Sequence, residues 1–119
     1  MELEVDLPKM TSLNRNNRVY ENELPIGIKA PVTLGIPDTF DTPLVDMVGE
    51  VEVIEGNVAK ITFFENKEDH ATDIIAGDKV LVPRGAGKVD RDNEKGIFVV
   101  TGFRLKDFNI IEKHRSAYL

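Results

Sequence analysis

The sequence predicts an all-β protein, a small, partly open β-barrel with an extended N-terminal arm and a long proline-rich connection. Short apolar runs alternate with polar residues, and glycine or proline separates most of these runs. The clearest example lies between Ile74 and Lys113, where several short apolar runs are interrupted by glycines. Because such short strands can bury one face only by curling onto themselves, this spacing is typical of a small barrel.

The length and composition indicate a single folded domain. The chain has 119 residues, of which 41% are hydrophobic and 30% are charged. This balance is ordinary for a globular protein with a thin core. We expect four parts within the domain: an arm over residues 1–12, an edge strand and interaction loop over 13–47, a barrel core over 48–113 and a tail over 114–119.

The arm is predicted from a period of two. Met1, Leu3, Val5 and Leu7 alternate with acidic residues until Pro8. Such alternation is typical of a strand with one apolar face. We therefore expect an edge strand, or an arm that pairs with another segment or another chain.

A second series with the same period follows. Its apolar members stand two residues apart, at Ile26, Ile28, Ala30, Val32, Leu34 and Ile36, and prolines occupy positions 25, 31 and 37. A proline has no N–H to donate and is therefore excluded from a fully paired central strand. We expect an edge strand or an extended arm whose apolar face is covered by a partner.

The remaining strands follow from turn signals. Val48–Ile54 and Val58–Phe64 flank Glu55-Gly56-Asn57, which predicts a hairpin. Only one of Phe63 and Phe64 can face the core of a half-buried strand. A charged loop or a single helical turn should follow the hairpin, and the closing strands are expected at Lys79–Val82, Ile97–Val100 and Asp107–Glu112.

The distribution of charge argues against nucleic acid as the partner. The net charge is −6, and all of the excess acid lies in residues 1–60, which hold 11 acids and 5 bases against 10 and 10 in residues 61–119. An acidic chain repels a phosphate backbone, so nucleic acid is not the expected partner. Interleaved acids also make a salt-bridged hairpin surface the favoured interpretation of the bases at Arg84, Lys88, Arg91, Lys95, Arg104 and Lys106.

The cysteine content, the first residues and the apolar runs indicate the cellular location to expect. With no cysteine there is no disulfide and no thiolate metal site. The first residues are acidic where a secretory signal would be basic, and no apolar run approaches the roughly 20 residues of a membrane span. We expect a cytoplasmic protein, or part of a particle assembled in the cytoplasm, that is not secreted by a signal peptide.

Motifs that resemble known chemistry are better explained as turns. Gly85-Ala86-Gly87-Lys88 lacks the first glycine and the Ser or Thr of a phosphate-binding loop. Asp90, Asp92 and Glu94 resemble the opening of a calcium loop, but the glycine comes one place late and no glutamate stands at the twelfth position. A glycine-rich hairpin turn and a solvated polar turn are the favoured interpretations.

No catalytic or cofactor-binding set is found. His70 stands among four acids but lacks a second histidine, so a surface residue is favoured over a metal ligand; whether this group binds a cation is left open. Asp38-Thr39 and Asp41-Thr42 lack the glycine of an aspartic-protease signature, and Asx turns explain them better. There is no serine-nucleophile motif. We expect no enzymatic activity, no metal and no cofactor.

Part of the chain resembles a known family. Ile75-Ala76-Gly77-Asp78-Lys79-Val80-Leu81-Val82 is similar to a Gly-Asp-x-Val strand, and Lys106–Glu112 is similar to a closing Asp-Ile-x-x-Ile-Glu strand. Together with the order of the other segments, these motifs resemble the GroES-type co-chaperonins. The resemblance implies a barrel fold and a ring-forming subunit, with residues 21–47 in the place of a loop that docks onto a chaperonin. The family's Pro-Leu-x-Asp-Arg-Val opening is absent.

Three functions therefore stand as hypotheses. The leading one is a structural subunit of a large symmetric assembly, such as a virion capsid, decoration or connector protein, which binds protein as a homo-oligomer or within a larger complex. The alternatives are a co-chaperonin-like ring and a nucleic-acid-binding barrel. The predicted partner-binding residues lie in the two alternating series: Leu3, Val5, Leu7, Ile26, Ile28, Val32, Leu34 and Ile36.

Overall fold

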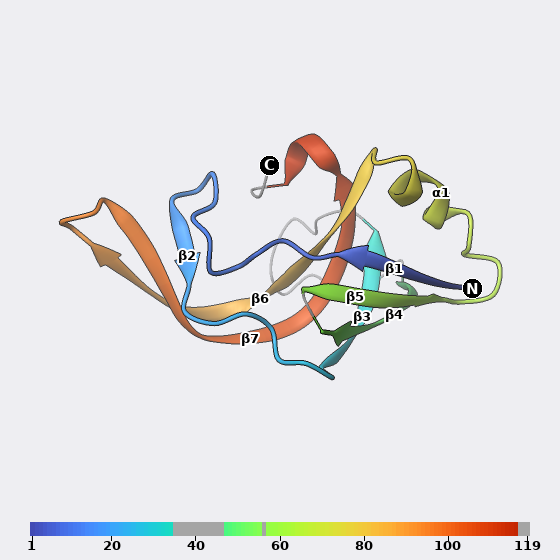
Figure 1. Ribbon diagram of the computed structural model, residues 1–119, viewed down its shortest axis with the longest axis horizontal. Coiled ribbons are helices and arrows are strands. Elements are labelled where there is room, and N and C mark those ends of the chain that lie inside the picture. Colours follow the sequence, from blue (N-terminus) through green and yellow to red (C-terminus); the bar gives the residue numbers. More distant parts are fainter. Residues whose placement is uncertain (35–46, 56, 117–119) are drawn as a thin grey trace.

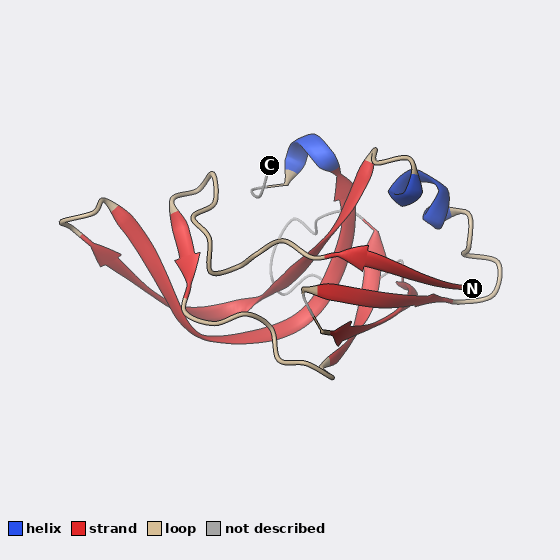
Figure 2. Ribbon diagram, in the orientation of Figure 1, coloured by secondary structure: helices blue, strands red, loops and turns tan. Residues whose placement is uncertain are grey.

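The computed structural model describes residues 1–34, 47–55 and 57–116. Over these residues the chain is mostly strand, with one short α-helix (Figure 1, Figure 2). The elements are β1 (Glu2–Asp6), β2 (Arg18–Tyr20), β3 (Lys29–Leu34), β4 (Met47–Ile54), β5 (Val58–Phe63), α1 (His70–Ile75), β6 (Lys79–Asp92), β7 (Ile97–Glu112) and a 3-10 turn over Lys113–Arg115.

The strands form one sheet in the order β1-β5-β4-β3-β7-β2, and β6 pairs along the other edge of β7. β7 is long enough for two strands to share one of its edges. β3 pairs with Phe108–Ile110, and β2 pairs with Phe98–Val100, both in parallel. No pairing joins β1 to β6 in the described part of the chain. The predicted β architecture is confirmed, whereas closure into a barrel is not.

β1 lies in the sheet of its own chain. Leu3 stands opposite Ile61 and Val5 opposite Ala59 in an antiparallel pair with β5. The apolar side chains of β1 pack against the core cluster, and its acids are exposed. The alternating segment is therefore an edge strand of the sheet over Glu2–Asp6. Its apolar face is covered by the protein's own core.

The prediction of an edge strand or an extended arm was wrong for β3, which lies between β4 and β7. Pro31 is tolerated there for a geometric reason. Val53 donates its N–H to Ile28 and Ala30 stands opposite Val51, so the backbone of Pro31 points away from β4. On the other side, pairing with β7 begins only at Val32. The missing N–H thus removes no bond of the sheet.

The hairpin of β4 and β5 is confirmed, with Ile54 opposite Val58. Its second strand also confirms the expectation for the two phenylalanines. Phe63 is 4% exposed and lies in the core, whereas Phe64 is 41% exposed. A left-handed Asn57, with φ of 59°, closes the turn, as asparagine readily does.

β6 and β7 are longer than predicted. The glycine segment at Gly85 and Gly87 is not a turn, because β6 continues through it with two register shifts. A Cβ on Gly85 would collide with the carbonyl oxygen of Arg104, so only glycine permits this close approach. The two strands form a twisted ribbon that extends beyond the rest of the sheet (Figure 1). The polar turn is confirmed at its tip, where Asp92 accepts hydrogen bonds from the amides of Glu94 and Lys95.

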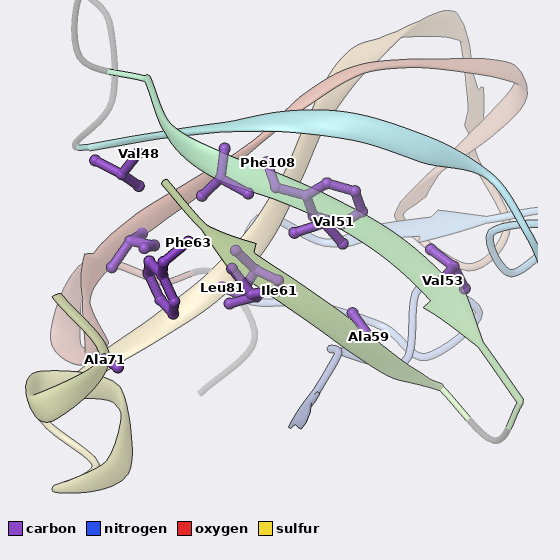
Figure 3. Close-up of a cluster of buried hydrophobic side chains, with 11 residues drawn as sticks. Val48, Val51, Val53, Ala59, Ile61, Phe63, Ala71, Leu81 and Phe108 are labelled. Carbon is purple, nitrogen blue, oxygen red and sulfur yellow. The ribbon is translucent and has the colours of Figure 1, made fainter. Parts of the chain in front are cut away.

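The core lies where β4 and β5 face the inner parts of β6 and β7. Figure 3 shows Val51 and Ile61 from the hairpin close to Leu81 and Phe108. Phe108, Ile61 and Val32 have no exposed surface. Burial of side chains of this kind contributes about 1.5–3 kcal/mol each, so this cluster holds the hairpin onto the long strands.

Candidate functional site

β1 presents an unpaired edge opposite β5. Phe63 donates its N–H to Met1, and Leu7 donates its N–H to Asn57. In an antiparallel pair the bonded residues alternate, so the odd-numbered residues of β1 bond to β5. The N–H and C=O groups of Glu2, Glu4 and Asp6 therefore point to the opposite side, where no strand pairs with them in the described chain.

Within the described residues, β6 presents a second unpaired edge. Lys113 donates its N–H to Asp78, which places the bonds to β7 on the even-numbered residues of this part of β6. The backbone groups of Lys79 and Leu81 point away from β7. Pro83 follows on the same edge and has no N–H, so any further pairing along β6 would end there.

A mostly apolar groove separates these two edges. It has a volume of about 330 Å³ beside α1 and continues into a hollow of about 250 Å³ beside Pro8. Asp6, Val80, Leu81 and Lys113 line both parts. The wider part is also lined by Leu3, Glu4, Val5, Ile74, Ile75, Gly77 and Lys79.

The walls of the groove carry opposite charges. On the β1 side, Glu4 and Asp6 have no ion-pair partner among the residues that the structure describes, whereas Glu2 lies 3.9 Å from Lys60. On the β6 side, Lys79 lies 3.3 Å from Asp73 of α1, and Lys113 is exposed. The acids of β1 are thus available to a positively charged group.

The structure divides the predicted partner-binding residues into several groups. Leu3, Val5, Leu7, Ile28 and Leu34 are partly buried and pack on the protein's own core. Val32 has no exposed surface, so a partner could reach its side chain only if the sheet opened. Ile26 is 72% exposed, and Ile36 lies outside the described residues. Of the predicted residues that the structure describes, only Leu3 and Val5 of β1 and Leu7, which follows β1, line the groove.

Several features of the groove were missed from the sequence. Ile75 at its rim is 67% exposed, but nothing in the local sequence shows that α1 ends beside β1. The pairing of β1 with β5 decides which of its backbone groups remain free. The sequence did indicate that β6 is an edge strand, because Pro83 directly follows an apolar run, which is typical of an edge.

Two ionisable groups outside the groove have shifted pKa values. Burial acts to raise the pKa of Glu23, but hydrogen bonds from the Thr11 hydroxyl and from the amides of Thr11 and Met10 outweigh it and hold the pKa below its ordinary value. The hydrogen bond to Asp107 raises the pKa of Arg84. Both groups hold segments of the fold together.

Among the described residues, no group of three or more histidine or acidic side chains is placed so that it could hold a metal ion. His114 lies 3.3 Å from Glu112, and both side chains are mainly exposed. Neither helix in the part of the chain that the structure describes has the length and apolarity needed to cross a membrane.

Comparison of the chain with protein-family models, with curated proteins and with solved structures finds no match. The groove and the charges around it are therefore the features that bear on function.

Proposed function

We propose that this chain is a non-enzymatic interaction protein that acts as a subunit of a larger symmetric assembly, such as a virion capsid, decoration or connector protein. The observation that supports the proposal is the pair of unpaired strand edges that face one another across an apolar groove. Exposed edges of this kind accept strands from other chains, because the added backbone satisfies their free N–H and C=O groups. In this proposal the sheet becomes a closed barrel only in the assembly.

Two further surfaces fit such a role. The ribbon of β6 and β7 projects from the sheet and carries exposed apolar side chains at Val89 and Phe98, which are 44% and 36% exposed (Figure 1). At the other end of the sheet Met1 is 54% exposed. Apolar groups at both ends of an elongated subunit suit contacts with neighbours on two sides.

Native mass spectrometry of the full chain over a range of concentrations tests the proposal. We expect a defined oligomer, or a defined complex when the chain is purified from its source. A chain that is monomeric at every concentration and without a partner in its source would contradict it.

The second candidate is a co-chaperonin-like ring subunit, which the order of the segments supports. In agreement with that order, the segment at Lys79–Val82 and the closing segment at Asp107–Glu112 pair with each other in the structure. Binding to a chaperonin that occurs only with nucleotide would favour this candidate over the first.

A further inference from the structure

We propose that the groove between β1 and β6 binds one extended segment of a partner protein as an added strand, antiparallel to both edges, with apolar residues facing inward and basic residues facing outward. The proposal deepens the assembly function given above and rests on it. Three features support the proposal. They are the direction of the two edge strands, the side-chain face of the residues whose backbone N–H and C=O groups are free, and the charges beside the edges.

The direction follows from the pairing. β1, β5, β4 and β3 are antiparallel in succession, β7 is parallel to β3, and β6 is antiparallel to β7. β1 and β6 therefore run the same way along the sheet. A single strand of opposite direction would be antiparallel to both, which is the more stable arrangement.

The two edges are also compatible in register. In an antiparallel bonded pair, the two residues that stand opposite each other have side chains on the same face. The free groups of β1 belong to Glu4 and Asp6, whose side chains face outward, and those of β6 belong to Leu81 and to Lys79 two residues before it, with Leu81 in the core.

A strand alternates both its side chains and its backbone groups. Its outward residues would bond to β1 and its inward residues to β6, so one segment satisfies both edges. Had the free groups come from the same face, no single strand could have bonded to both.

The charges then select the occupant. Each outward side chain of the added strand stands opposite Glu4 or Asp6, which lack ion-pair partners in the described chain. Opposite charges in such cross-strand pairs are stabilising and like charges are destabilising. The inward side chains meet Leu3, Val5 and Leu81, which favours apolar residues there. Lys79 lies on the same face of β6 as Leu81, but its charge is already paired with Asp73.

A second copy of this chain is not the expected donor through its own β1. That strand carries Glu2, Glu4 and Asp6 at its outward positions, so its acids would stand opposite the acids of the acceptor. These acids protect the edge against pairing with itself, as charges on edge strands commonly do. A basic and apolar segment from a different protein fits instead.

The experiment uses two synthetic peptides of about six residues, the length of an ordinary strand. In one, valine alternates with lysine; in the other, valine alternates with glutamate. Each is titrated into the isotopically labelled full chain, and amide resonances are followed by NMR. We expect the lysine peptide to shift the amides of Glu4, Asp6, Lys79 and Leu81, with about tenfold tighter binding than the glutamate peptide.

A charge reversal sharpens the test. The double variant Glu4→Lys/Asp6→Lys should reverse the preference in favour of the glutamate peptide. The matched control Asp90→Lys/Glu94→Lys makes the same change of charge on the ribbon and should leave the preference unchanged. Equal binding of both peptides, no binding of either, shifts confined to the ribbon, or self-association through β1 would each overturn the proposal.

The outcomes also separate this proposal from the assembly function. Suppose that the chain is monomeric and without a partner in its source, but binds the lysine peptide in the groove. This result would support the groove proposal and contradict the assembly function. An assembled chain with an inert groove would give the reverse.

Discussion

At the scale of single residues, one buried ion pair could not be predicted from the sequence. Asp107 is fully buried in β7, and the Arg84 side chain is only 13% exposed. The Arg84 Nε lies 2.9 Å from Oδ1 of Asp107, and the guanidinium donates hydrogen bonds to both carboxylate oxygens. From the sequence, Arg84 was one of six bases on a salt-bridged hairpin surface. Burial makes this pair structural instead.

We predict that Asp107→Ala destabilises the protein by about 3–5 kcal/mol, because it leaves a charged guanidinium poorly compensated in the interior. Chemical denaturation measures the change. The double variant Arg84→Met/Asp107→Leu should recover much of the loss, since no buried charge then remains. A cost below 1 kcal/mol for the single variant would show that the pair is solvated.

Glu23 predicts a pH dependence. Its pKa is lower in the folded protein than its ordinary value of 4.5, so its ionised form stabilises the fold above that pH. The contribution is lost as the pH falls through the folded pKa. Glu23→Gln should therefore lower the free energy of unfolding by about 1 kcal/mol at neutral pH, and the difference should vanish in acid. A difference that is independent of pH would contradict the role of the charge.

At the scale of elements, the two edges of β1 are chemically distinct. The odd-numbered residues bond to β5 and the even-numbered residues point to the groove. A proline can therefore separate the stability of the strand from its capacity to accept a partner.

We predict that Glu4→Pro leaves the fold intact and abolishes strand addition, because the N–H that it removes has no strand partner among the described residues. Val5→Pro, one residue away, should instead loosen β1, because the N–H of Val5 points to β5. Thermal unfolding measures the stability of both variants, and titration with the lysine peptide measures strand addition. Equal destabilisation by both variants would show that the alternation along β1 is not as described.

At the scale of the whole molecule, the sheet is open between β1 and β6 in the described part of the chain. The open sheet leaves backbone groups free at two edges in the described chain, and the ribbon carries exposed apolar side chains at Val89 and Phe98. These features are the reason to expect assembly. We predict that the oligomer or complex seen by native mass spectrometry is weakened in Glu4→Pro, if the groove carries the contact. An unchanged assembly in this variant would direct attention to Val89 and Phe98 on the ribbon.

The sequence by itself determined the class of fold and most of the strands, because period-two alternation and turn residues act locally. The hairpin at Glu55-Gly56-Asn57 and the choice between Phe63 and Phe64 followed from such local rules. The central position of β3 did not, since Pro31 is acceptable there only because its neighbours leave that side unpaired. The glycines at 85 and 87 could not be assigned to a bend or to a turn without their cross-strand neighbours.

Only the tertiary structure decided where an interaction site could lie. The alternation of Met1 to Leu7 indicated a strand with one apolar face, but pairing with β5 showed that this face is covered and that the opposite backbone edge is free. The groove arises between segments some 70 residues apart in the chain, Glu4 and Lys79 among them. Local sequence encodes the shape of a strand, whereas the identity of its neighbours depends on how distant strands pack together, and that decides which groups remain unpaired.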